Sequence, residues 1–212
     1  MNRRSRGGIG RRGRSIRFSE REIRDLLAAW VALGVAFAFF FGGGADAIAS
    51  GRFVELFIVS FVTAGVGFLL HELAHKYVAV KFGQLAEFRA DYMMLLLAIG
   101  SALAGFIFAA PGAVYHRGRI TPAQHGMIAV AGPITNLLLV LAFVPLLVIP
   151  VGLIQMIGTY GVLVNAFLAA FNMIPFGPLD GKTVIDWDKR VFATVFVISV
   201  GLTIGSALVL LF

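Results

Sequence analysis

The chain has 212 residues, of which 59% are hydrophobic and 14% are charged, and its mean hydropathy is +0.90. A soluble domain carries roughly 25% charged residues, so this composition excludes an ordinary soluble protein and predicts a multi-pass membrane protein. The chain has no cysteine, which excludes disulfides and leaves His, Asp and Glu as the ligands for any metal.

The net charge of +7 is concentrated near the N-terminus, where nine of the 18 Lys and Arg residues lie within the first 24 positions. Beside a membrane span, such a block favours a cytoplasmic tail that faces anionic lipid. It lacks the aromatic interleaving that base stacking needs, so we expect no nucleic-acid partner. We therefore expect a basic cytoplasmic tail at residues 1–25 and a single transmembrane domain at residues 26–212.

Six apolar runs follow, and most are close to the roughly 20 residues that cross a bilayer as a helix. They lie at about 26–45, 53–80, 93–114, 126–150, 151–175 and 191–212. We expect an all-α polytopic membrane protein with five to six transmembrane helices. Thr121 as N-cap and Pro122 as first helical residue predict where the helix of the fourth run begins. The stretch 176–190 is expected to be a polar loop.

The third run, 93–114, contains many small residues and ends in a Pro-Gly breaker, so hydropathy leaves open whether it crosses the membrane. With a cytoplasmic N-terminus and a non-crossing third run, 17 of the 18 basic residues face the cytoplasm and only Arg52 lies outside. A crossing run would leave 12 inside and 6 outside. The positive-inside bias therefore favours a re-entrant or otherwise non-crossing segment, in a cell-membrane protein whose N-terminus is cytoplasmic.

The second run contains HELAH at residues 71–75. His71 and His75 are four residues apart, so on a helix both imidazoles can bind one ion. Glu72 lies about 100° further round the helix, within reach of a metal-activated water, and is the predicted catalytic base of peptide hydrolysis. Composition predicts only roughly 0.002 chance matches to this pattern. The alternative, histidines bonded only to backbone or to other spans, is disfavoured because ionisable residues are costly inside a membrane.

A catalytic zinc needs a third protein ligand and one open position. The candidates are the remaining histidines and the acidic residues near the apolar runs: His116, His125, Glu87, Asp91, Asp180, Asp186 and Asp188. Asp180 is favoured because it follows a Pro-interrupted helix end, a broken backbone that can direct a carboxylate back into the membrane. The favoured topology also places Asp180 on the same side as HELAH. His116 and His125 are interpreted as interfacial residues without a ligand role.

HELAH, AGPITN at 131–136 and NMIPFGPLDG at 172–181 resemble, in this order, the motifs HExxH, GPxxN and NxxPxxxLDG. These motifs belong to the site-2 protease family of intramembrane zinc metalloproteases, peptidase family M50. The resemblance implies one zinc ion per chain, bound by His71, His75 and Asp180, with Glu72 as the catalytic base and acid. It also implies that the substrates are single-span transmembrane proteins in the lipid bilayer, cleaved near the cytosolic face in regulated intramembrane proteolysis.

Through the same resemblance, Asn172 corresponds to a residue associated with substrate handling and Asn136 to one that supports the site. Either asparagine could instead form an ordinary hydrogen bond between helices, and Gly132 is interpreted as a packing notch. The segment 108–120 occupies the place of a membrane-dipping β-hairpin that in the family pairs with an extended substrate. Strand addition is physically sensible because a transmembrane helix must unwind before its amides can be attacked.

An alternative function is a metal-ion transporter or channel that uses His71, His75 and Asp180 as a transit site. A transporter would more naturally show paired repeats with ionisable groups in both halves, whereas HExxH occurs once. An inactive scaffold is disfavoured because all four predicted active-site residues are present. The sequence indicates neither the oligomeric state nor the physiological substrate.

Overall fold

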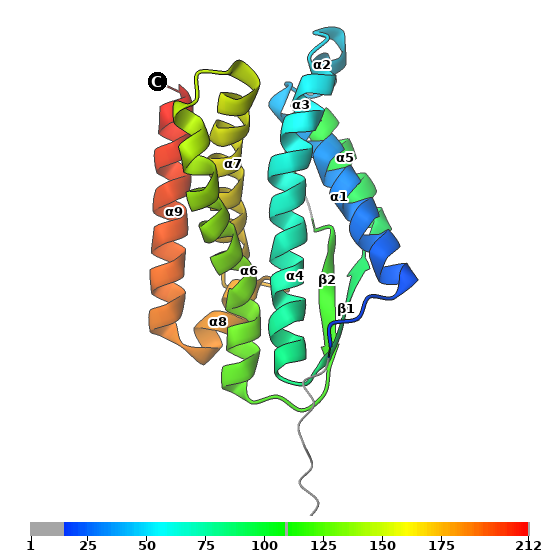
Figure 1. Cartoon of the computed structure of the whole chain (residues 1–212), viewed down its shortest axis with the longest axis vertical. Helices are drawn as coiled ribbons and strands as arrows, with labels where there is room; N and C mark the ends of the chain where they lie inside the picture. The colour runs from blue at the N-terminus through cyan, green and yellow to red at the C-terminus, as the bar shows by residue number, and fades with distance from the viewer. Residues whose placement is uncertain (1–14, 109, 212) are drawn as a thin grey trace, which may run out of the picture.

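The computed structural model describes residues 15–108 and 110–211 as a bundle of long helices with one small sheet (Figure 1). The elements, in chain order, are α1 (Glu20–Phe41), α2 (Asp46–Ala49), α3 (Phe53–Ser60), η1 (Phe61–Gly65), α4 (Val66–Lys81), β1 (Leu85–Ala90), α5 (Tyr92–Leu103), β2 (Gly112–Arg117), α6 (Pro122–Phe143), η2 (Val144–Val148), α7 (Gly152–Asn172), α8 (Asp180–Trp187) and α9 (Lys189–Leu211).

Within the described residues, five helical stretches are long and apolar enough to cross a membrane. They are Glu20–Phe41, Phe53–Lys81, Pro122–Val148, Gly152–Asn172 and Lys189–Val209. This confirms the prediction of an all-α polytopic protein with five to six such helices. Residues 1–14 of the predicted tail lie outside the described residues, and α1 begins at Glu20, before the end of the predicted tail.

The start of α6 follows from local sequence. Thr121 is the N-cap and its side chain accepts a hydrogen bond from the Gln124 N–H, while the Gln124 side chain accepts one from the Thr121 N–H. This reciprocal pair satisfies two of the donors that a helix start leaves unpaired. The predicted N-cap and first helical proline are therefore confirmed.

The second span is not a regular α-helix, because the five residues of η1 form a π-helical turn between α3 and α4. The Trp30 indole N–H donates to the Phe61 carbonyl over 2.9 Å, and the two rings stack with centroids 4.4 Å apart. A Cβ at Gly65 would lie 2.3 Å from the Trp30 ring, so only glycine leaves room for this contact. Trp30 thus binds a backbone acceptor on the π turn and packs against it.

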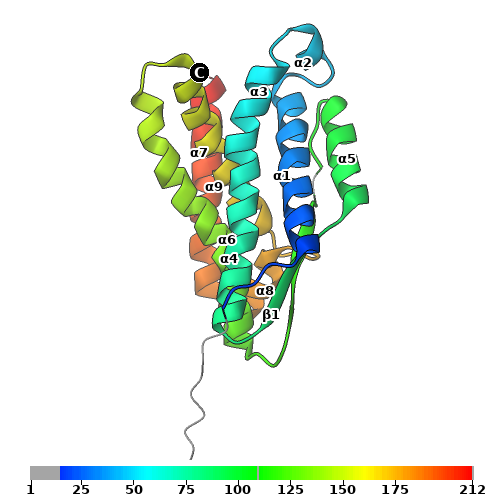
Figure 2. The ribbon, with the colours of Figure 1, turned by 45° about the vertical axis from the view of Figure 1, so that its right-hand side comes forward.

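Strands β1 and β2 pair antiparallel, and the register pairs Ala90 with Gly112. The chain between these two residues therefore leaves the sheet and returns to it at the same level. It contains α5, which has 12 residues and is about 18 Å long, against a hydrocarbon core of roughly 30 Å. Figure 2 shows α5 alongside α1 at the edge of the bundle. The prediction that the third apolar run does not cross is confirmed.

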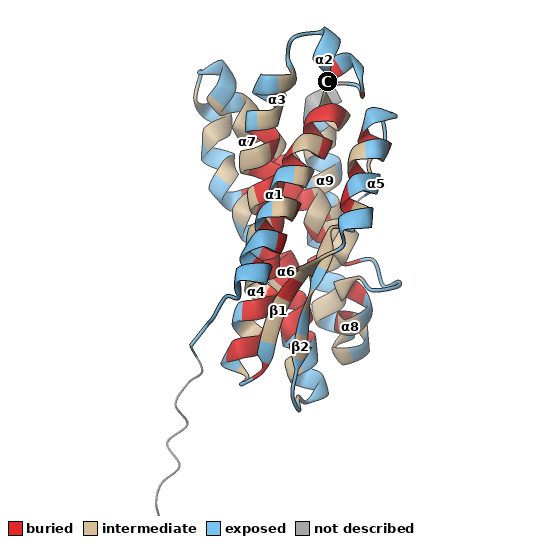
Figure 3. Cartoon of the chain, turned by 90° about the vertical axis from the view of Figure 1, so that its right-hand side faces the viewer, coloured by how far each residue is buried: buried red, intermediate tan, exposed pale blue. Residues whose placement is uncertain are grey.

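The prediction of a polar loop over 176–190 was wrong, because α8 occupies its centre. Val184 is fully buried, and it packs with Trp187 among apolar residues of α6 and α9. These two apolar residues are three apart and share one helix face. The mostly polar composition of the segment conceals this pattern. Figure 3 shows the two strands crossing the same half of the bundle that holds α8.

Candidate metal centre

Three possible metal ligands from two distant elements meet beside α6. His71 and His75 lie on α4, and Asp180 is the first residue of α8. The Asp180 Oδ2 atom is 3.2 Å from the His71 Nε2 atom and 3.3 Å from the His75 Nε2 atom. One ligand atom from each residue lies within 4.8 Å of the others. The structure thus brings together the three residues predicted to bind zinc.

The hydrogen bonds around the two histidines determine which ring nitrogens are free. His71 Nδ1 lies 2.6 Å from the Asn136 Oδ1 atom and His75 Nδ1 lies 2.7 Å from the Ile128 carbonyl oxygen. Each Nδ1 therefore donates to an acceptor, while each Nε2 points toward Asp180. Asn136 is oriented by its own Nδ2 atom, which donates to the Gly67 carbonyl.

Two imidazole nitrogens and a carboxylate oxygen therefore face one another, which is a donor set that zinc commonly takes. Asp180 Oδ2 is buried and makes no hydrogen bond, so it is available as a metal ligand. In a tetrahedral zinc site with bonds of about 2.0–2.1 Å, neighbouring ligand atoms are about 3.3 Å apart, close to the two measured separations. The residues present fit zinc.

Asn165 is a buried residue that the sequence does not single out, and it holds Asn136 in place. Asn165 on α7 accepts from the Asn136 Nδ2 atom over 3.0 Å, and its own Nδ2 atom donates to the Gly161 carbonyl over 2.9 Å. A Cβ at Gly67 would lie 2.5 Å from the Asn165 Oδ1 atom, so glycine makes room for the pair. Such partners fix the ring of a metal-binding histidine. A fully buried amide in an apolar span was the signal that could have found it.

The close approach of α7 and α8 explains how Asp180 reaches α4. A Cβ at Gly181 would lie 2.1 Å from the Met173 carbonyl oxygen, so only glycine permits this contact. Gly177 adopts a φ of 60°, the left-handed conformation that favours glycine in the turn before α8. The Pro- and Gly-containing break thus returns the chain to the cluster, as the sequence predicts.

The cluster opens into a cavity of 620 Å³ whose walls are mainly apolar. Glu72, the predicted catalytic base, lines this cavity together with the three possible ligands. Its carboxylate interacts with the backbone N–H of Val114 on β2. The volume is in the range of sites that bind a ligand or a short stretch of chain. The arrangement thus places a carboxylate beside the possible metal ligands in a cavity with mainly apolar walls.

The remaining predicted residues lie around the cavity rather than in the cluster. Asn172 lines it, and its Nδ2 atom donates to the Leu168 carbonyl. His116 and His125 also line it, with ring centroids 5.5 Å apart. Burial lowers the pKa of His116, and its electrostatic interactions with His125 and His75 act in the same direction. Neither of these two histidines joins the cluster.

Gly132, the glycine of AGPITN, lies against both histidines. A Cβ at this position would be 2.5 Å from the His71 Nε2 atom and 2.5 Å from the His75 Nε2 atom. We expect Gly132→Ala to displace both rings and to weaken zinc binding about 10–100-fold. The measurement is zinc per chain after equilibration against a series of chelator concentrations.

Gly201→Ala is the matched control for this prediction, because Gly201 also lies in a helix but a Cβ there has nothing within 4 Å. It should retain the zinc affinity of the wild type. Equal affinity in the two alanine variants would contradict the packing role assigned to Gly132.

The fold and the site define a class: a multi-pass membrane protein with a buried His/His/Asp centre suited to a divalent metal. The chain is 42% identical over 183 residues to "Putative zinc metalloprotease MJ0611" of Methanocaldococcus jannaschii, covering 84% of this chain and 91% of that protein. It is 34% identical over 146 residues to "Putative zinc metalloprotease YwhC" of Bacillus subtilis, covering 59% of this chain and 66% of that protein.

The chain belongs to this family of zinc metalloproteases. No family model matches it, and no solved structure matches it.

Proposed function

We propose that the protein is an intramembrane zinc endopeptidase of the site-2 protease type, which cleaves single-span transmembrane proteins near the cytosolic side. One observation carries the proposal: two imidazole nitrogens and a carboxylate oxygen without a hydrogen bond converge beside Glu72 within a bundle of apolar helices. Membership of a zinc metalloprotease family supports the hydrolytic part. The apolar cavity supports a substrate taken from the membrane.

In the proposed reaction, His71, His75 and Asp180 hold one zinc ion. Zinc bound there supplies Lewis-acid activation of water and of the scissile carbonyl. The Glu72 carboxylate accepts the proton of the attacking water and then delivers it to the departing amine nitrogen. Asn136 accepts a hydrogen bond from His71 Nδ1 and so orients the ring, which would direct Nε2 toward the metal.

The edge of β2 that faces away from β1 is the proposed binding surface for an unwound substrate. Phe88 and Val114 are cross-strand partners, and the Phe88 N–H points away from β2. The pair is therefore a non-hydrogen-bonded one, so the backbone of Val114 points away from β1. Val114 and its neighbours Gly112 and His116 line the cavity. A substrate strand added along this edge would have its amides beside Glu72.

The topology proposed with this function has a cytoplasmic N-terminus and a basic tail at residues 1–25. The non-crossing segment between Ala90 and Gly112 supports it, because that arrangement leaves 17 of the 18 basic residues on the cytoplasmic side. The β-sheet and Asp180 then lie on the same side as the C-terminal half of α4.

The test uses the full-length protein purified in detergent, with zinc per chain measured first. We expect about one zinc per chain and cleavage of some members of a panel of single-span proteins. Chelation should abolish cleavage, and added zinc should restore it. Absence of zinc and of cleavage would overturn the proposal. Zinc-dependent uptake into liposomes without cleavage would instead support a metal transporter.

A further inference from the structure

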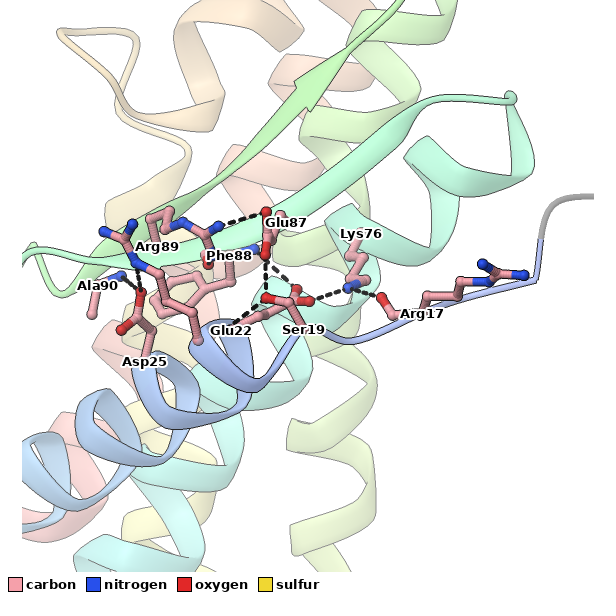
Figure 4. A network of polar contacts seen from close by, with 10 residues as sticks. Arg17, Ser19, Glu22, Asp25, Lys76, Glu87, Phe88, Arg89 and Ala90 are labelled. Carbon is pink, nitrogen blue, oxygen red and sulfur yellow. Dashed lines mark hydrogen bonds and ion pairs between the residues drawn. The ribbon is translucent and has the colours of Figure 1, made fainter.

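The outer edge of β1 is closed by acidic side chains of α1. The Phe88 N–H donates to the Glu22 Oε1 atom over 3.0 Å, and the Ala90 N–H donates to the Asp25 Oδ2 atom over 3.4 Å (Figure 4). Two carboxylates three residues apart on α1 thus accept from two N–H groups that lie two residues apart on β1. The Tyr92 hydroxyl also donates to Asp25. These carboxylates occupy backbone donors that another strand could otherwise use.

The Glu22 carboxylate also binds α4, the helix that carries His71 and His75. Its Oε2 atom lies 2.5 Å from the Lys76 Nζ atom, and Lys76 directly follows His75. Glu22 is 0% exposed and Lys76 is 1% exposed, so Lys76 is buried and does not face the cytoplasm as its charge predicts. Lys76 also donates to the Arg17 carbonyl over 2.6 Å, and its ammonium lies 4.0 Å from the centre of the Phe18 ring. One carboxylate therefore joins α4 to β1.

This connection continues across the sheet to Glu72. Phe88, which Glu22 binds on the outer edge, is the cross-strand partner of Val114. Val114 is the residue whose backbone N–H interacts with the Glu72 carboxylate. The Phe88 ring also packs on Phe68 of α4, with centroids 5.7 Å apart. Glu22, the two strands and Glu72 thus form one continuous series of contacts.

We propose that Glu22 is a positioning residue, which holds the β1–β2 sheet at a fixed place against α4 and leaves the β2 edge as the one offered to substrate. Lys76 and Asp25 complete this arrangement. The proposal rests on the proposed function, because the strand that it positions is the one assigned to substrate. It adds a role for the start of α1, which contributes no residue to the metal cluster.

The test compares two double variants that both remove the buried charges. Glu22→Gln/Lys76→Met keeps a side-chain oxygen that can accept from the Phe88 N–H, whereas Glu22→Ala/Lys76→Met does not. Because both lack the ion pair, the loss of charge cancels in the comparison. Relative to the Gln variant, we expect the Ala variant to raise KM for a single-span substrate about tenfold, with kcat and zinc per chain little changed.

A second measurement is amide hydrogen exchange of the peptides 85–90 and 112–117. We expect faster exchange in both peptides in the Ala variant than in the Gln variant, and an unchanged rate in Glu55→Gln. Glu55 is a suitable control because its ion pair with Arg52, at 3.7 Å, is exposed and lies at the opposite end of the second span.

The two measurements separate failure of this proposal from failure of the proposed function. Equal KM and equal exchange in the two double variants would overturn the positioning role, even if the wild type cleaves substrate. If the wild type cleaves nothing, the proposed function and the substrate part of the positioning role fail together. Amide hydrogen exchange then decides whether Glu22 holds the sheet. Equal exchange rates in the two double variants would show that it does not.

Discussion

Glu72→Gln should abolish cleavage and leave zinc in place. The substitution keeps the size of the side chain but removes the group that accepts a proton from water, and the loss of a general base costs about 10²- to 10⁴-fold in rate. Glu72 is not part of the three-residue cluster, so zinc per chain should match the wild type. The measurement is single-turnover cleavage of a single-span substrate, with metal analysis of the same samples.

Two outcomes would contradict this assignment in different ways. Equal cleavage by wild type and Glu72→Gln would remove Glu72 from the reaction. Loss of zinc in Glu72→Gln would show that the side chain also supports the metal. A suitable control is Glu20→Gln, because Glu20 is an exposed residue of α1 and does not line the site cavity.

Asp180→Ala is expected to lose zinc. Removing a direct ligand leaves two histidines, so affinity should fall by more than the roughly 100-fold that losing an outer hydrogen-bond partner of a ligand can cost. Asp180 supplies the oxygen that lies within 3.3 Å of both histidine nitrogens. The measurement is zinc per chain over a chelator series, and cleavage should disappear with the metal.

Asp186→Ala is the matched control, because Asp186 lies in the same helix α8 but is exposed and pairs with Lys182. It should retain zinc. Full retention of zinc by Asp180→Ala would exclude Asp180 from the ligand set, and zinc loss in both variants would point to damage to α8 instead.

Much of the fold could be predicted because membrane spans are local patterns. Runs of apolar residues, the Thr121–Pro122 start and the Pro-Gly breaks each lie within one stretch of sequence. The non-crossing third run was also predictable, because the basic residues of each loop can be counted from the sequence without knowledge of any contact. The helix α8 was missed because its two apolar residues pack against α6 and α9, which a short polar stretch does not reveal.

The metal cluster was predictable to the extent that its residues stand in recognisable spacings. His71 and His75 are one helical turn apart, and Asp180 follows a break that sequence can identify. Asn165 and the Ile128 carbonyl were not predictable in their roles, because each acts through contact with an element far along the chain. The burial of Lys76 was concealed for the same reason, since its partner Glu22 is 54 residues away.

The π turn at Phe61–Gly65 determines the angular phase of everything that follows it in the second span. A π turn absorbs one extra residue, and one residue of an α-helix corresponds to about 100° of rotation. Were the span regular from Phe53 to Lys81, with its first half unmoved, Leu70 and Ala74 would face α6 where the two histidines now face. A helical wheel drawn over the whole span therefore misassigns its faces, and the face that carries His71 and His75 is correct only when counted from Val66.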